Sequence, residues 1–147
     1  MTIKLLTPAL SVSPQLTEAD LAKAARDGFR AIIDNRPDGE EPGQVSAADM
    51  ERLAAAYGMA FAHVPVVPGK IGDEDVARMA DALSRLGSPV LAYCRTGTRS
   101  TSLWALSQAG ALPADTILRT ASDAGYDLTA LRPRLETTAV IPEGAGP

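Results

Sequence analysis

The sequence contains few of the residues that stabilise proteins through covalent links, metals or aromatic packing. Its 147 residues include one cysteine, one histidine and one tryptophan, and aromatic side chains make up only 4% of the chain. A single cysteine excludes a disulfide within the chain, and Cys94 with His63 is too small a set for a protein metal site. We therefore expect an aliphatic core, no metal and no other cofactor.

Positive charge and long apolar runs are also missing. The net charge is −4, and no basic patch interrupts the spread of acidic residues, so nucleic acid is not an expected partner. No apolar run reaches the roughly 18 residues that cross a membrane, and no membrane association is expected. The first seven residues become polar too quickly for a signal peptide. These features predict a cytoplasmic protein.

Strand and helix patterns alternate along most of the chain. Apolar runs predict strands over residues 9–13, 29–33, 59–67 and 90–93, with the first strand at an edge. Capping residues and helical spacing predict helices over 18–27, 47–57, 73–86, 101–108 and 113–122, and a last short helix over 128–135. This order predicts an α/β fold with a central, mainly parallel sheet flanked by helices. We expect one domain over residues 1–138 and a disordered tail over residues 139–147.

Three loops follow predicted strands and carry polar residues. They are the segments around Asn35, Arg36 and Asp38, around Pro68–Lys70, and around Cys94. Ligands of open α/β sheets bind outside the carboxyl ends of the strands, so the three loops should face one crevice.

The cysteine loop is the strongest candidate for chemistry. It reads Tyr93-Cys94-Arg95-Thr96-Gly97-Thr98-Arg99-Ser100. A glycine turn before a helix points backbone N–H groups at an anion, and the helix N-terminus favours the ionised form of a nearby thiol. We predict that Cys94 and Arg99 are catalytic, with Cys94 as a nucleophile beside an anion site. The rest of the anion-binding loop is then Arg95, Thr96, Gly97, Thr98 and Ser100. The structural alternative is a buried cysteine near a helix start, and Arg95 has the alternative of facing solvent.

The loop after residue 33 supplies possible accessory residues. Asn35, Arg36 and Asp38 could reach the substrate, although Asn35 and Arg36 could equally anchor their own loop to the end of the sheet. Gln15 could brace the cysteine loop. His63 lies within a predicted strand and is expected to be a packed or hydrogen-bonded core residue.

Five segments of the chain resemble a known bacterial family. They are Ser13–Thr17, Ile33–Glu41, His63–Val66, Pro89–Ser100 and Ala124–Leu128. The chain is similar, from about Leu10 to Leu135, to the phosphatase-like domain of beta-lactamase-hydrolase-like proteins, a family also labelled as sulfur transferases. The resemblance implies a fold like that of tyrosine and dual-specificity phosphatases, with Cys94 as the nucleophile.

Two departures from the phosphatase pattern bear on the activity. Four residues separate Cys94 from Arg99, one fewer than in tyrosine phosphatases, and the loop is similar to that of rhodaneses, which carry a persulfide. The segment Val66–Lys70 also lacks the aspartate that serves dual-specificity phosphatases as general acid. Asp38, Glu40 or Glu41 could substitute, although a solvated turn is the simpler explanation of the two glutamates.

These departures favour sulfur transfer as the predicted function. Cys94 would take a sulfane sulfur from a small-molecule donor, and a thiol acceptor would collect it from the Cys94 persulfide. A phosphatase acting on a phosphate ester through a Cys94 phosphocysteine is the alternative, and a non-catalytic anion-binding module is the third possibility. A sulfur dioxygenase is a possible functional partner, because family members are sometimes fused to one.

Overall fold

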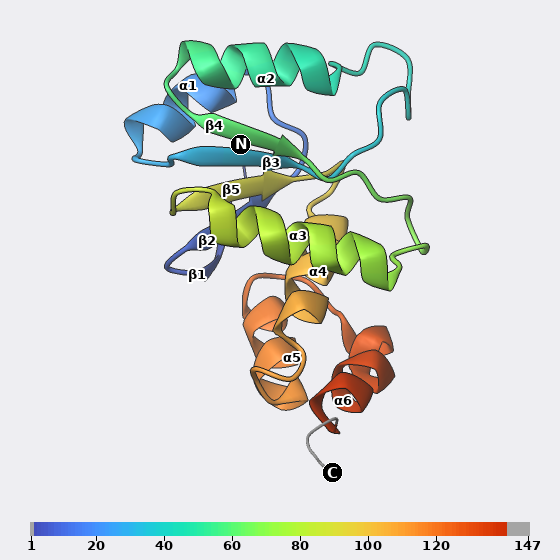
Figure 1. Ribbon diagram of the computed structural model, residues 1–147. Coiled ribbons are helices and arrows are strands. Elements are labelled where there is room, and N and C mark those ends of the chain that lie inside the picture. Colours follow the sequence, from blue (N-terminus) through green and yellow to red (C-terminus); the bar gives the residue numbers. More distant parts are fainter. Residues whose placement is uncertain (1, 141–147) are drawn as a thin grey trace.

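A five-stranded sheet forms the centre of the computed structural model, which describes residues 2–140 (Figure 1). The strands lie in the order β1 (Lys4–Thr7), β2 (Leu10–Ser13), β5 (Val90–Tyr93), β3 (Ala31–Asp34) and β4 (Ala60–His63). Only β1 is antiparallel to its neighbour, and the other pairs are parallel. The predicted fold class is therefore confirmed.

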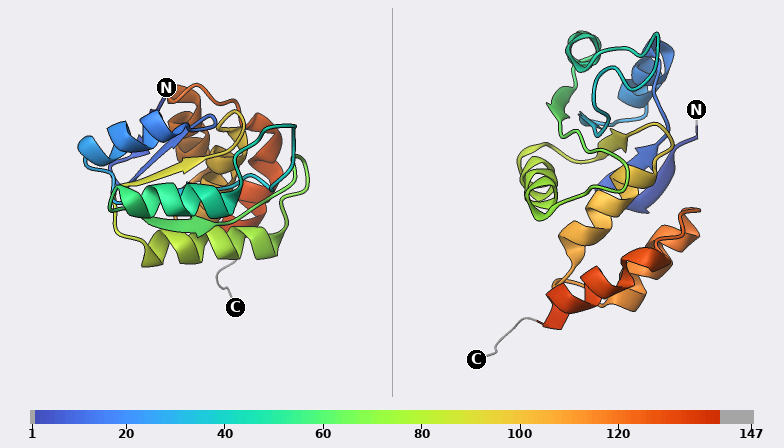
Figure 2. Two further views of the ribbon diagram at one scale, coloured as in Figure 1. Left: turned by 90° about the horizontal axis from the view of Figure 1, so that it is seen from above. Right: turned by 90° about the vertical axis from the view of Figure 1, so that its right-hand side faces the viewer.

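Helices cover both faces of the sheet. Helices α1 (Glu18–Arg26) and α2 (Ala47–Ala56) lie on one face, and α3 (Asp73–Arg85) and α4 (Thr98–Gln108) lie on the other (Figure 1). Helices α5 (Ala114–Asp123) and α6 (Arg132–Val140) and the short 3-10 turn η1 (Thr129–Leu131) pack beyond α4, away from the sheet (Figure 2). In the part of the chain that the structure describes, no helix has the length and apolar character needed to cross a membrane.

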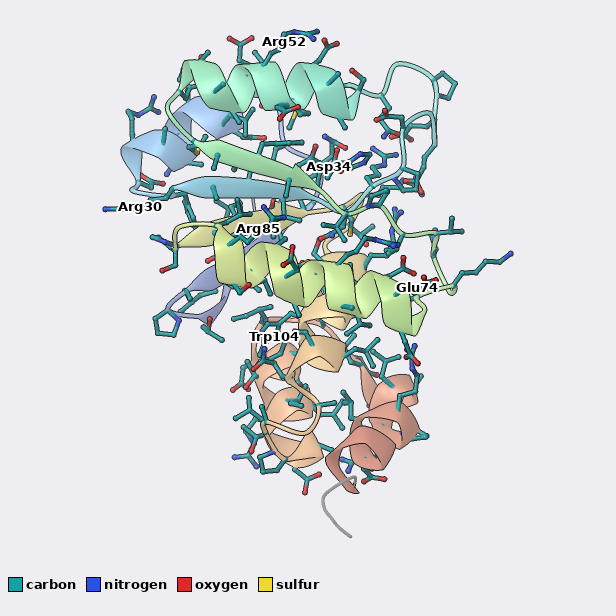
Figure 3. The ribbon with its side chains drawn as sticks, in the orientation of Figure 1. Arg30, Asp34, Arg52, Glu74, Arg85 and Trp104 are labelled. Atoms are coloured by element: carbon teal, nitrogen blue, oxygen red, sulfur yellow. The ribbon has the colours of Figure 1, made fainter. Side chains whose placement is uncertain are left out.

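The alternation of side chains along β3 divides the core in two. Ile32 packs with α1 and α2, whereas Ala31 and Ile33 face the cluster formed by α3, α4 and α5. Trp104 of α4 is 3% exposed and belongs to this second cluster (Figure 3). Helix α4 is therefore buried between the sheet and α5, which fixes the position of its first turn and of the cysteine loop before it.

The structure differs from the predicted elements at four places. Strand β1 was not predicted, and because Lys4 pairs with Val12, β2 is not an edge strand. Strand β4 ends at His63 instead of residue 67, since Pro65 has no N–H to continue the ladder. Helix α4 begins three residues earlier than predicted, at Thr98. Helix α6 extends beyond residue 135 to Val140, and residues 141–147 of the predicted tail lie outside the described residues.

The loops after β3, β4 and β5 meet at one edge of the sheet. Figure 3 shows Asp34 at the carboxyl end of β3, on the side of the molecule where these loops lie. The Asn35 N–H donates to the Tyr93 carbonyl (2.9 Å), and the Val66 N–H donates to the Asn35 carbonyl (3.1 Å). These two bonds join the three loops directly, as expected for ligand sites of open α/β sheets.

Candidate active site

Cys94 follows the last residue of β5 and is fully buried. The chain then turns through Gly97, whose φ of +95° is a conformation that glycine adopts without steric cost. This turn brings the Gly97 N–H to 3.0 Å from the Cys94 sulfur, immediately before α4 begins at Thr98. A hydrogen bond from a backbone N–H and the positive end of a helix both favour a thiolate.

Arg99 lies in the first turn of α4 and is 8% exposed. Its Nη1 donates to Glu40 Oε2 (2.7 Å) and to the Val66 carbonyl (2.9 Å), and its Nη2 donates to Glu40 Oε1 (3.0 Å). A guanidinium group has five N–H donors. Within residues 2–140, the Nε–H and the second Nη2–H have no acceptor, so they remain available to an anion.

Arg36 connects the loop after β3 to the cysteine loop. Its side chain is buried, and it donates from Nε to Glu40 Oε1 (2.7 Å) and from Nη1 to Gln15 Oε1 (2.8 Å). Its Nη2 forms an ion pair with Glu41 Oε1 at 2.9 Å. Gln15 in turn donates its backbone N–H to the Arg95 carbonyl (3.4 Å). Arg36 therefore anchors its own loop, as one of the two sequence-based interpretations holds, and Gln15 braces the cysteine loop.

The carboxylates of the loop after β3 are already engaged. Hydrogen bonds from Arg99 and Arg36 hold the pKa of Glu40 below its ordinary value, against a smaller opposing effect of burial. Hydrogen bonding to Arg36 likewise lowers the pKa of Glu41. Asp38 accepts the N–H of Ala47 at the start of α2 (2.8 Å). Glu40 lies in an exposed turn, as predicted, but its side chain is only 20% exposed because it pairs with Arg99 and Arg36.

The two other candidates, Asn35 and His63, make hydrogen-bond contacts with the backbone of neighbouring loops. Asn35 is buried and donates from Nδ2 to the Val64 carbonyl (2.9 Å), which anchors the loop after β4. His63 is not a core residue as predicted: it occupies an exposed position at the end of β4 and places Nε2 2.8 Å from the Arg36 carbonyl. No group of three histidine, cysteine or acidic side chains among the described residues could hold a metal ion. Neither residue points to a cofactor.

The remaining loop residues differ in what they can offer an anion. The hydroxyls of Thr96 and Thr98 lie 3.1 Å apart and form a hydrogen bond on the surface. Ser100 is fully buried, and its hydroxyl has no partner within the described part of the chain. The Arg95 side chain is 66% exposed and lies 4.0 Å from Glu41. The roles of these residues as anion ligands therefore stay predictions.

Two cavities flank the cysteine loop. The first, of about 340 Å³, is lined by residues of the loops after β4 and β5, of α4 and of the C-terminal segment. Its walls combine the apolar Pro68, Ile71 and Leu131 with the cations Arg95 and Arg99. The second shares Pro68, Arg95 and Arg99 with the first and is also lined by Arg36, Glu40 and Glu41. The loop is thus bordered by a partly apolar pocket and by an ionic one.

The fold of this chain resembles that of solved phosphatase structures. The structure of Tk-PTP superposes with a TM-score of 0.71 and covers 94% of this chain and 95% of its own, at 18% identity. At that identity the likeness shows the fold alone.

Residues 2–111 match the model of the phosphatase-like domain of beta-lactamase hydrolase-like proteins, and the chain belongs to this family. A beta-lactamase hydrolase-like protein of Agrobacterium fabrum is 33% identical over 136 residues, which are 90% of this chain and 32% of that protein. The chain therefore spans about a third of the length of this curated relative. A solved structure from Neisseria meningitidis, of a protein proposed to be a phosphatase, has a TM-score of 0.84 and 40% identity, and covers 94% of this chain and 99% of that one.

Sequence reasoning found the nucleophile candidate and its loop but missed two contacts. Glu40 was considered as a proton donor, whereas it is the partner of Arg99, 59 residues away. Tyr126 was noted only as part of a family segment, yet its hydroxyl donates to the Thr96 carbonyl (3.3 Å). The opposite charges of Glu40 and Arg99 permit the first contact but do not distinguish Glu40 from the other acids of its loop, and the sequence holds no signal for the second.

Proposed function

We propose that this chain is a cysteine-dependent enzyme of the phosphatase type, in which Cys94 is the nucleophile. One observation carries the proposal: the Gly97 N–H lies 3.0 Å from the Cys94 sulfur, in a loop whose Arg99 keeps two N–H donors for an anion. Family membership and the 40% identical structure of a proposed phosphatase support the same activity.

The reaction would proceed in two displacements. The Cys94 thiolate attacks phosphorus, the sulfur–phosphorus bond forms, and the bond to the leaving oxygen breaks with its electron pair remaining on that oxygen. Water then attacks phosphorus, the sulfur–phosphorus bond breaks, and Cys94 returns as a thiolate while the water proton passes to phosphate or solvent. Arg99 and the loop amides stabilise the charge on the equatorial oxygens in both steps.

The site restricts the leaving group. General acid catalysis contributes about a hundred- to ten-thousandfold in enzymes that use it. The Glu40 carboxylate is held ionised by two arginines, and one oxygen of Asp38 accepts the Ala47 N–H at the start of α2. The favoured substrates are therefore phosphates whose leaving group departs without protonation, such as aryl phosphates of acidic phenols and phosphoric anhydrides.

Sulfur transfer is the second candidate, and the same engaged carboxylates favour it. A thiolate that attacks a sulfane sulfur expels sulfite or another thiolate, and neither needs a proton. The Cys94 persulfide then passes its outer sulfur to an acceptor thiolate, and Cys94 leaves as the thiolate. The loop with four residues between Cys94 and Arg99 is also short for a tetrahedral phosphate. A sulfur dioxygenase would be the functional partner in this case.

A side-by-side assay separates the two reactions. The purified protein receives para-nitrophenyl phosphate in one arm, and thiosulfate with cyanide or glutathione persulfide with a thiol acceptor in the others. Phosphate release supports the phosphatase proposal, and the intact mass of a trapped intermediate should show one phosphoryl group on Cys94. Cys94→Ser is the matched control and should lose both signals while keeping the circular dichroism spectrum of the parent.

The contrary result is equally definite. Thiocyanate or a persulfidated acceptor without phosphate release, together with one added sulfur atom on Cys94, would replace the phosphatase proposal with sulfur transfer. No turnover in any arm would leave the non-catalytic anion-binding module as the function.

A further inference from the structure

Tyr126 contacts the cysteine loop although it comes from the segment after α5. Its hydroxyl donates to the Thr96 carbonyl at 3.3 Å. A Cβ atom at Gly97 would lie 2.2 Å from the Tyr126 hydroxyl oxygen and 2.9 Å from Cζ. The phenol therefore sits directly against the peptide bond between Thr96 and Gly97, in space that only a glycine leaves open.

The same peptide bond carries the N–H that meets the nucleophile. Because a peptide unit is planar and trans, its carbonyl and its N–H point in opposite directions, and fixing one end orients the other. The Thr96 carbonyl is held by Tyr126, and the Gly97 N–H points at the Cys94 sulfur (3.0 Å). We infer that Tyr126 is a positioning residue, whose hydroxyl holds the Thr96–Gly97 peptide so that its N–H stabilises the Cys94 thiolate.

The end of helix α5 fixes the place of Tyr126. The Gly125 N–H donates to the Ser122 carbonyl (2.9 Å) and the Tyr126 N–H donates to the Ala121 carbonyl (2.9 Å). With Gly125 at φ +99°, these two bonds form the motif in which a left-handed glycine closes a helix. The backbone of Tyr126 is thus set by the helix end, independently of the loop that its side chain reaches.

The surroundings keep the hydroxyl in its donor form. Burial, and to a smaller degree the charge of nearby Cys94, raises the pKa of Tyr126 above its ordinary value. The phenol therefore retains its proton at neutral and mildly alkaline pH. The other charged groups of the described residues that line the two cavities beside the loop are Arg36, Glu40, Glu41, Arg95, Arg99 and Arg134. All six are unchanged by a substitution that removes only the Tyr126 hydroxyl.

The test replaces Tyr126 by phenylalanine and measures ionisation of the single thiol. Thiolate is followed by ultraviolet absorbance against pH, as the difference between each protein and its own Cys94→Ser counterpart. Tyr126→Phe should shift the midpoint of thiolate formation upward by up to about one unit, the loss expected if the Gly97 N–H no longer holds the sulfur. The value of kcat/KM on the substrate found for the parent should fall about three- to tenfold.

Tyr57→Phe is the matched control, since that hydroxyl also makes one side-chain hydrogen bond, to Glu18, but on the surface next to α1. It should leave the thiolate midpoint where it is in the parent. An unchanged midpoint of thiolate formation in Tyr126→Phe would overturn the inference and show that Tyr126 contributes only to packing.

This inference rests on Cys94 acting as the nucleophile, yet the two can fail separately. A shifted midpoint in a protein that turns over no substrate would support the role of Tyr126 and contradict the proposed function. Turnover by the parent together with an unchanged thiolate midpoint in Tyr126→Phe would support the proposed function and contradict the role of Tyr126.

Discussion

Two loops at the carboxyl edge of the sheet handle charge in different ways. The loop after β5 presents backbone: the Gly97 N–H meets the Cys94 sulfur, and α4 starts at the next residue. The loop after β3 presents charged side chains, and three of them form ion pairs, Glu40 with Arg99 and Arg36, and Glu41 with Arg36. The loop after β5 carries the proposed nucleophile and the N–H groups that would bind an anion. The charged side chains of the loop after β3 hold Arg99 in place.

The paired glutamates of the loop after β3 are suited to orienting Arg99 and not to donating a proton. A carboxylate that accepts hydrogen bonds from two guanidinium groups is stabilised in its ionised form, so it is a poor proton donor at neutral pH. The same contacts fix the Arg99 side chain, and the proposed function assigns its Nε–H and one Nη2–H to the substrate. The paired glutamates near this cysteine therefore hold Arg99 in place and are poor proton donors.

The largest side-chain effect is expected at Arg99. Arg99→Lys keeps a positive charge but loses the planar group that bonds Glu40, the Val66 carbonyl and the anion together. We expect kcat/KM to fall by about a hundredfold or more, the usual loss when a donor to a developing anion is removed. Steady-state kinetics on the substrate established for the parent provide the measurement.

Arg95→Lys is the matched control, because this neighbouring arginine is exposed and makes only a long contact with Glu41. It should change kcat/KM by no more than about threefold. Equal losses in the two variants would show that Arg99 acts only through net positive charge.

A smaller effect is expected at Glu40. Glu40→Gln keeps the shape but removes the charge that holds Arg99, and we expect kcat/KM to fall roughly tenfold on every substrate, whatever its leaving group. Glu41→Gln, on the same loop but exposed, should change it by less than about twofold. A loss in Glu40→Gln that is confined to poor leaving groups would instead identify Glu40 as the general acid.

The Glu40 ion pairs also make a pH-dependent contribution to stability. Hydrogen bonds from Arg99 lower the folded-state pKa of Glu40, so its stabilising effect is complete above the ordinary value of 4.5 and is lost as the pH falls through the lower folded value. The parent should exceed Glu40→Gln by roughly 1 kcal/mol in unfolding free energy from pH 7 to about pH 5. Urea titrations should show that this difference in unfolding free energy becomes smaller below about pH 5. A difference that stays constant with pH would contradict an ionised Glu40 in the folded protein.

The smallest effect on activity is expected at Asp38. Asp38→Ala removes the acceptor for the Ala47 N–H and should cost about 1 kcal/mol of unfolding free energy while kcat/KM stays within about twofold. Asp49→Ala in the first turn of α2, whose side chain pairs with exposed Arg52, is the control and should cost less. A large loss of turnover in Asp38→Ala would contradict its structural assignment.

The parts that the sequence could predict are those encoded over short distances. The apolar run before Cys94, the glycine after it and the arginine in the following turn define a strand, a loop and a helix within ten residues. The alternation of strands and helices then places this loop beside those after β3 and β4, and the structure confirms that arrangement.

What could not be predicted depends on partners far apart in the chain. Strand β1 is short and has two exposed residues, and it is defined only by its pairing with β2. Glu40 looks like any other acid of a polar loop until Arg99 is placed opposite it. The position of Tyr126 follows from the packing of α5 against α4, which brings residues 30 apart in sequence into contact.

The most direct test of the account is the leaving-group dependence of the first displacement by Cys94. The measurement is kcat/KM of the parent protein over a series of aryl phosphates whose phenols span a wide range of acidity, with Cys94→Ser as the blank. Because hydrogen bonds from arginines lower the pKa of Glu40 and of Glu41 and hold both ionised, kcat/KM should fall steeply as the phenol becomes less acidic. Equal kcat/KM across the series would reveal a proton donor in the site and would contradict the account.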